Sequence, residues 1–211
     1  MNILVTGGST WIKIDEVRVI TNIFTGRTGL YLAKYFKRKG CNVTFLFNPH
    51  CLDRIPKSIR AIPFRYFDEL KNILEEELKL NRYDVIIHSA AVSDYKLRFA
   101  FKGKIPSGKK ELILKLVPTP KLIKIIRNLG RNSFIVQFKL EIEKEGLMKK
   151  AYQSLKNNKS DLVVANSWED LKSSYKAFII DKKKNVREVD SLKSLGYFLW
   201  EGIKTKALPS K

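Results

Sequence analysis

The chain has 211 residues, of which 44% are hydrophobic and 11% aromatic, a composition typical of a globular protein with a buried core. No apolar run reaches about 18 residues and the first one is too short for an export signal, which excludes a membrane-spanning helix and predicts a cytoplasmic protein. The formal net charge is +20, but the basic residues are scattered along the chain rather than gathered in one tail, so we do not expect nucleic acid as a partner.

The two cysteines, Cys41 and Cys51, match no zinc-binding spacing. We expect both to be reduced thiols, and the sequence predicts no residues that bind a metal directly.

Strand and helix patterns alternate through the first half of the chain. The expected order is a strand at 3–5, a helix at 27–39 closed by Gly40, a strand at 42–47, a helix at 67–80 and a strand at 84–88. This spacing predicts an α/β fold, with a Rossmann-like, mostly parallel sheet and helices on both faces.

The second half opens with a segment of different character. Residues 96–111 carry Gly, Pro and many lysines, which predicts an exposed, mobile loop; we call residues 98–110 the flap. After it we expect a strand at 112–117, a helix at 120–128, a strand at 133–138, a helix at 143–157, a strand at 161–165, a hairpin of 177–180 and 186–189, and a helix at 191–204. The whole chain, 1–211, is expected to form a single domain.

Small and polar residues follow several of the expected strands, at the sheet edge where α/β proteins bind ligands. Gly7, Gly8 and Ser9 follow the first strand, and Ser89, Ala90 and Ala91 follow the third. Residues 21–29 open the first helix with hydroxyl groups, two glycines and a cation, a pattern that suits phosphate binding but is also a common helix cap.

Taken together, these motifs are more specific than any one of them. They are, in order, Gly7-Gly8-Ser9-Thr10, Ile14-Asp15 with Val17-Arg18, Ile20-Thr21-Asn22 with Gly26 and Gly29, Ala90-Ala91-Val92-Ser93-Asp94-Tyr95, Lys104-Ile105 with Leu116-Val117-Pro118-Thr119-Pro120, Phe138-Lys139-Leu140-Glu141, and Asp161-Leu162-Val163-Val164-Ala165-Asn166. The set resembles phosphopantothenoylcysteine synthetase, also called phosphopantothenate–cysteine ligase, in its single-function bacterial type. The resemblance covers residues 3 to about 166.

The resemblance implies a two-step ligation in coenzyme A synthesis. The carboxylate of 4'-phosphopantothenate attacks the α-phosphate of CTP to give an acyl-cytidylate, and the amine of cysteine then displaces the nucleotide to form the amide. ATP remains an alternative to CTP, and Mg²⁺ is expected to arrive with the triphosphate. The resemblance also implies a homodimer and no flavin.

Carried over residue by residue, the resemblance assigns catalytic roles to Asn22 and Lys104. Asn22 would serve the acyl-nucleotidylate intermediate, and Lys104 on the flap would close over the phosphates. The expected nucleotide-binding residues are Gly8, Ser9, Ala90, Ala91, Asp94, Phe138, Lys156 and Lys159, and the expected substrate-binding residues are Asn22, Gly26, Arg27 and Ala90.

Some residues depart from the family pattern. Ser9 replaces a usual glycine, Pro106 follows the Lys-Ile of the flap, and the lysine spacing before Asp161 differs from the common bacterial one. Each assigned residue also has a plain structural explanation: Asn22 as a helix cap, Asp94 as a turn residue and Phe138 as part of the core.

Two other functions stay open. A short-chain dehydrogenase would use Tyr152 and Lys156 as its catalytic pair, but Trp11 and Lys13 stand where its later cofactor-binding glycines should lie. A basic nucleic-acid-binding module is the non-enzymatic alternative, which charge alone supports.

Overall fold

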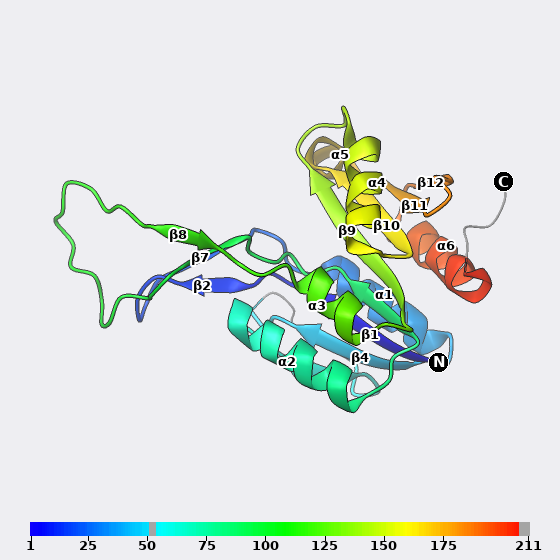
Figure 1. The fold of residues 1–211 in the computed structure, drawn as a ribbon, viewed down its shortest axis with the longest axis horizontal. Coiled ribbons are helices and arrows are strands. Elements are labelled where there is room, and N and C mark those ends of the chain that lie inside the picture. The colour runs from blue at the N-terminus through cyan, green and yellow to red at the C-terminus, as the bar shows by residue number, and fades with distance from the viewer. Residues whose placement is uncertain (51–53, 207–211) are drawn as a thin grey trace.

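The computed structural model describes residues 1–50 and 54–206, and a mixed, mostly parallel eight-stranded sheet forms its centre (Figure 1). The strand order is β12-β11-β10-β9-β6-β1-β4-β5. The strands are β1 (Asn2–Gly7), β4 (Asn42–Phe47), β5 (Arg60–Pro63), β6 (Val85–His88), β9 (Phe134–Glu141), β10 (Leu162–Ser167), β11 (Ala177–Asp181) and β12 (Val186–Val189). The pairs from β5 to β10 are parallel, whereas β11 pairs antiparallel with both β10 and β12.

Helices cover both faces of this sheet, as the sequence predicted. They are α1 (Arg27–Arg38), α2 (Phe67–Leu80), α3 (Leu122–Leu129), α4 (Leu147–Asn158), α5 (Trp168–Ser173) and α6 (Leu192–Thr205). Successive residues of β1 point to opposite faces, so Ile3 and Val5 pack with α1 and α6 while Leu4 packs with α2 and α3. On this second face α4 packs over β10 and β11. The fold is therefore a three-layer α/β/α arrangement of the Rossmann-like type.

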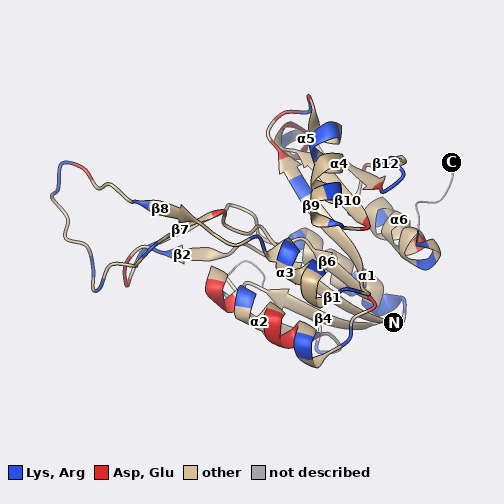
Figure 2. Ribbon diagram, viewed as in Figure 1, with Lys and Arg blue, Asp and Glu red and all other residues tan. Residues whose placement is uncertain are grey.

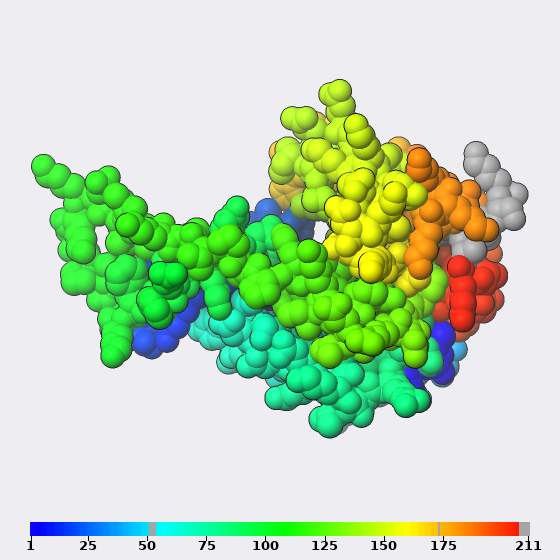
Figure 3. Space-filling view, viewed as in Figure 1, coloured from blue at the N-terminus to red at the C-terminus, as the bar shows by residue number. Residues whose placement is uncertain are grey.

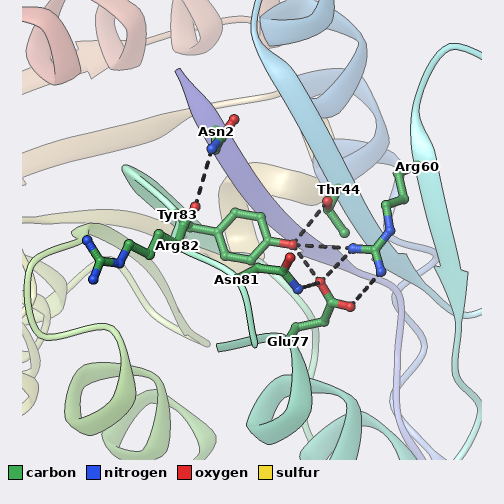
Figure 4. Close-up of polar contacts among 7 residues, drawn as sticks. All are labelled: Asn2, Thr44, Arg60, Glu77, Asn81, Arg82 and Tyr83. Atoms are coloured by element: carbon green, nitrogen blue, oxygen red, sulfur yellow. Dashed lines mark hydrogen bonds and ion pairs between the residues drawn. The ribbon is translucent and has the colours of Figure 1, made fainter. Parts of the chain in front are cut away.

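A polar cluster ties the edge strand β5 to α2 and to the start of β6 (Figure 4). The guanidinium of Arg60 donates to both oxygens of the buried Glu77 carboxylate, at 2.6 and 2.7 Å, and the hydroxyl of Tyr83 donates to the same carboxylate at 2.6 Å. The hydrogen bond from Arg60 lowers the pKa of Glu77. Burial, followed by the hydrogen bond to Glu77, raises the pKa of Tyr83 to about 12.

A long arm projects from the body of the molecule (Figure 3). It consists of two antiparallel pairs, β2 (Trp11–Lys13) with β3 (Val19–Thr21) and β7 (Tyr95–Leu97) with β8 (Leu116–Pro118). The loop from 98 to 115 joins β7 to β8 at the end of the arm.

One strand predicted from the sequence differs in the structure, and it lies in the arm. The strand predicted at 112–117 begins only at Leu116 and pairs with β7 rather than with the main sheet. The reason is that β7 ends at Leu97, opposite Leu116, so the residues before Leu116 have no strand to pair with. The alternating apolar pattern there includes the exposed side chains of Leu112 and Ile113.

Lysine and arginine are spread over the helices, the arm and the loops of the described structure, as the sequence indicated (Figure 2). Cys41 is a buried free thiol, and Cys51 lies outside the described residues. In residues 1–50 and 54–206 no helix is both long enough and apolar enough to cross a membrane.

Candidate functional site

A cleft of about 1170 Å³ opens where β6, β9 and β10 end. Its walls come mainly from residues 24–28, 88–92, 119–124 and 137–141 and from one side of α4. The cleft therefore lies at the carboxyl edge of the parallel strands, where the sequence analysis expected a ligand.

The loop before α1 packs directly on the loop after β1, and glycines make this approach possible. Gly26 has φ +81°, and a Cβ atom there would lie 2.2 Å from the backbone nitrogen of Gly8. A Cβ atom at Gly29 would lie 2.8 Å from the Oγ of Ser89. Both positions require glycine, because any larger residue would push the start of α1 away from the strand ends.

Three helices begin at the cleft without a capping side chain. The first turns of α1, α3 and α4 line it, none of the three has a side chain that caps its N-terminus, and none carries an acidic residue in its first turn. By contrast, α2, which has no residue in the lining, has Asp and Glu in its first turn. Uncapped helix N-termini carry partial positive charge and donate N–H groups, so together the three favour an anionic ligand.

The charged side chains of the cleft are also mainly positive. Its lining includes six cationic side chains and two acidic ones: Arg27, Lys121, Lys124, Lys139, Lys149 and Lys150 against Asp94 and Glu141. Lys139 and Lys150 each lie 2.8 Å from the Glu141 carboxylate, and their hydrogen bonds lower its pKa. Lys121 pairs with Asp94 at 2.6 Å. Because six cationic side chains face only two carboxylates, a phosphate-bearing ligand would meet a net positive surface.

His88 forms part of the wall and is almost fully buried. Its Nδ1 lies 2.9 Å from the hydroxyl of Thr6, and the same hydroxyl accepts a hydrogen bond from the backbone N–H of Ala90. Burial lowers the pKa of His88 to about 4, so the ring is neutral at physiological pH.

Most of the residues that the sequence assigned to the site do line the cleft: Asn22, Gly26, Arg27, Ala90, Ala91, Asp94 and Phe138. The Nδ2 of Asn22 donates to the carbonyl of Ala91 at 3.1 Å, which joins the segment before α1 to the loop after β6. Asn22 lies outside α1 and does not cap it, since α1 begins after Gly26.

Gly8 and Ser9 are not part of the lining and lie behind it. The carbonyl of Gly8 accepts from the N–H of Ala91 at 3.0 Å, and the hydroxyl of Ser9 donates to the carbonyl of Phe24. Gly8 and Ser9 therefore stabilise the loops that line the cleft, since the Gly8 carbonyl and the Ser9 hydroxyl are hydrogen-bonded within the protein.

Three predicted lysines also lie outside the lining. Lys104 is exposed on the flap, and Lys156 and Lys159 are exposed at the end of α4. The side of α4 that faces the cleft carries instead Lys149, Lys150, Gln153, Ser154, Asn157 and Asn158.

Several residues that line the cleft were not predicted from the sequence. Lys124 and Lys149 lay in helices whose orientation was not known, and Asn166, at the end of an expected strand, was given no role in the site. Its position directly after the apolar run of β10 was the signal that could have identified it.

The proposed dehydrogenase pair gains no support. The hydroxyl of Tyr152 donates to the carbonyl of Lys182 at 3.2 Å, and neither Tyr152 nor Lys156 lines the cleft. Among residues 1–50 and 54–206, no three His, Cys, Asp or Glu side chains gather in a way that could hold a metal ion.

The chain is similar to known proteins over nearly its whole length. It is 32% identical to the coenzyme A biosynthesis bifunctional protein CoaBC of Thermococcus kodakarensis over 206 residues, which are 95% of this chain and 50% of that protein. It is 31% identical to the CoaBC protein of Borreliella burgdorferi over 90% of this chain and 48% of that protein. The chain thus spans about half the length of the curated relatives it matches.

Solved structures share the fold. The DNA/pantothenate metabolism flavoprotein from Streptococcus pneumoniae superimposes with a TM-score of 0.86 at 26% identity, covering 97% of this chain and 99% of that one. A Cab2 mutant, H337A, in complex with phosphopantothenate-cysteine superimposes with a TM-score of 0.82 at 20% identity, covering 97% of this chain and 85% of that one. Residues 1–195 match the family described as the DNA/pantothenate metabolism flavoprotein C-terminal domain, and the chain belongs to that family.

Proposed function

We propose that the chain is a phosphopantothenate–cysteine ligase of coenzyme A biosynthesis. The observation that carries the proposal is the cleft on which three uncapped helix N-termini and six cationic side chains converge. Both proposed substrates of the first step, 4'-phosphopantothenate and a nucleoside triphosphate, carry phosphate groups that such a cleft suits. Related CoaBC proteins, named for coenzyme A biosynthesis, support the pathway.

The proposed reaction has two steps. A carboxylate oxygen of 4'-phosphopantothenate forms a bond to the α-phosphorus of CTP, and pyrophosphate leaves with the electrons of the broken P–O bond. The amine of cysteine then forms a bond to the acyl carbon, loses a proton, and CMP leaves with the former carboxylate oxygen. Both steps need fixed positions and charge stabilisation, which backbone N–H groups and lysines supply.

The proposed roles follow from where the residues lie. Asn22 and the backbone of Ala90 and Ala91 would hold the acyl group, because these residues lie together at one wall of the cleft. The N-terminus of α1 with Arg27 would bind a phosphate group. Phe138 would pack on the nucleotide, and Lys104 would reach the triphosphate when the arm that carries it closes.

Mg²⁺ would enter as a complex with the triphosphate. The two carboxylates of the lining, Asp94 and Glu141, are each paired with lysine, so the phosphate oxygens would be its main ligands. The chain's own part would be to hold the phosphates by its N–H groups and cations.

We also propose a homodimer in the cytoplasm. Large apolar side chains are exposed along the arm of the single chain, among them Phe99, which is 80% exposed, and Ile113, which is 71% exposed. A second copy that covers the arm would bury them. Light scattering after gel filtration tests the state, and a monomer at micromolar concentration would refute it.

The main test is release of pyrophosphate. The purified chain should release pyrophosphate from CTP with Mg²⁺ only when 4'-phosphopantothenate is present, and should form the cysteine amide when cysteine is added. A parallel series with ATP decides the nucleotide. No release with either nucleotide, or release that does not depend on 4'-phosphopantothenate, would refute the ligase.

Two matched pairs of variants test the residues. Lys104→Gln should slow pyrophosphate release, whereas Lys102→Gln, the same change two residues earlier on the exposed flap, should not. Lys149→Gln should raise the KM for the nucleotide or for phosphopantothenate, whereas Lys156→Gln on the same helix, outside the lining, should leave both values unchanged.

A further inference from the structure

Asp15 is a buried carboxylate in the turn between β2 and β3 that contacts the flap. Its residue is 1% exposed. Oδ1 accepts hydrogen bonds from the backbone N–H groups of Val17 at 2.9 Å and Arg18 at 2.8 Å. Oδ2 accepts from the Arg18 guanidinium at 2.6 Å and from the backbone N–H of Ile105 at 3.0 Å. One carboxylate thus joins two segments that are 90 residues apart in sequence.

The backbone N–H and carbonyl groups of Ile105 are both hydrogen-bonded to the turn between β2 and β3. Its N–H donates to Asp15, its carbonyl accepts from the Nη1 of Arg18 at 3.2 Å, and its side chain is buried. The segment before it follows the same turn: the N–H of Phe101 donates to the carbonyl of Ile14 at 2.8 Å, and the carbonyl of Gly103 accepts from the N–H of Glu16 at 3.2 Å.

The flap therefore has two different parts. The backbone of Phe101, Gly103 and Ile105 is hydrogen-bonded to the turn between β2 and β3, whereas residues 106–110 are exposed and have no hydrogen bond to this turn. The exposed loop expected from composition thus contains one part that is anchored by the buried carboxylate of Asp15. Lys104 lies at the junction, directly before the residue that Asp15 holds.

We propose that Asp15 is a positioning residue, which fixes the backbone at Ile105 and thereby the place of Lys104 on the arm. This inference rests on the proposed ligase function in one respect only, namely the role of Lys104 in the reaction. With Asp15 in place, Lys104 moves together with the hairpin of β2 and β3, and only the residues after it move as a free loop.

The protonation state of Asp15 favours a contact with Ile105 that persists over the pH range in which the protein would act. Hydrogen bonding from Ile105 lowers its pKa to about 2, with smaller contributions from the backbone of Val17 and Arg18, and burial opposes this shift. The carboxylate is therefore ionised at every pH at which the protein would act. Removing it would leave the buried N–H of Ile105 without its acceptor, which is the costly way to break such a contact.

The test uses Asp15→Ala, the milder Asp15→Asn and a matched control, Glu16→Gln. Glu16 carries the same charge at the next position, but its side chain is 57% exposed and pairs with Lys13 at the surface. Hydrogen exchange should accelerate about tenfold or more at the Ile105 amide in Asp15→Ala, less in Asp15→Asn and not in Glu16→Gln, while the amides of β6 stay protected in all three. This readout requires no enzymatic activity.

Kinetics test the consequence for Lys104. Asp15→Ala should lower kcat for pyrophosphate release on the order of tenfold, and the double variant with Lys104→Gln should be no slower than Lys104→Gln alone. Unchanged exchange at Ile105, equal acceleration in β6, or additive losses in the double variant would overturn the proposal. If the wild-type chain releases no pyrophosphate, the ligase function fails by itself, and the exchange experiment still decides whether Asp15 anchors the flap.

Discussion

Acidification should destabilise this fold through one histidine. His88 is 9% exposed, and burial lowers its pKa to about 4, whereas an unfolded chain would titrate near the ordinary value of 6.5. Above pH 6.5 the ring is neutral in both states and contributes no pH dependence. Below it the unfolded chain binds a proton that the folded protein does not, so stability falls until the pH reaches about 4.

The size of the effect follows from the gap between the two pKa values. At about 1.4 kcal/mol for each pH unit, the loss is about 2 kcal/mol at pH 5 and about 3 kcal/mol at pH 4. Such a loss is a large part of the stability of an ordinary domain. Most carboxylates stay ionised between pH 6.5 and pH 5, so this window isolates the histidine.

Urea unfolding at several pH values measures the loss of stability that His88 causes. His88→Gln keeps a neutral side chain that can hydrogen-bond to Thr6, so its stability should change less than that of the wild type between pH 6.5 and pH 5. His50→Gln is the matched control, because it removes the other histidine of the chain from an exposed position, so that any pH dependence it keeps does not come from His50. The reasoning is refuted when wild type and His88→Gln lose equal stability over this window.

Three further variants test other contacts by urea unfolding. Gly26→Ala forces a Cβ atom against Gly8 at a positive φ, so it should cost about 1–3 kcal/mol from backbone strain alone and disturb the cleft; unchanged stability would refute the close packing. Tyr83→Phe removes the hydroxyl that donates to the buried Glu77 and should cost about 1–3 kcal/mol, and a neutral effect would contradict the polar cluster. Ser167→Ala removes the oxygen that caps α5 and should cost about 1 kcal/mol; a loss below 0.3 kcal/mol, on the order of a surface change, would show that the cap matters little.

The main sheet was predictable because its strands are buried. The strands β1, β4, β6, β9 and β10 each contain an apolar run bounded by polar or small residues, since helices cover both faces. Their alternation with amphipathic helices then defines a parallel sheet. For the same reason the edge where loops meet was predictable, and with it Asn22, Ala90 and Phe138 at the cleft.

The arm was not predictable from the same signals. β2, β3 and β7 are three residues long, too short for a periodic pattern. β7 pairs with β8 across the long loop from 98 to 115, and the contact from Asp15 to Ile105 joins residues 90 apart in sequence. The lysine-rich composition of the flap indicated exposure correctly for every residue from 98 to 110 except Ile105, but it carried no information about a buried carboxylate elsewhere in the chain.

The cations of α4 show that the face a helix packs on the sheet decides which lysines reach a site. The family resemblance favoured Lys156 and Lys159, near the end of a helix expected at 143–157; α4 itself begins at Leu147, after Gly146 in a left-handed conformation. Leu147, Ala151 and Leu155 pack on the sheet, and a helix advances about 100° per residue. This register turns Lys150 and Ser154 toward the cleft and leaves Lys156 exposed outside it. Positive charge at this wall therefore comes from the first turn of α4, where it adds to the charge of the helix N-terminus, and not from the last turn, where the helix dipole would oppose it.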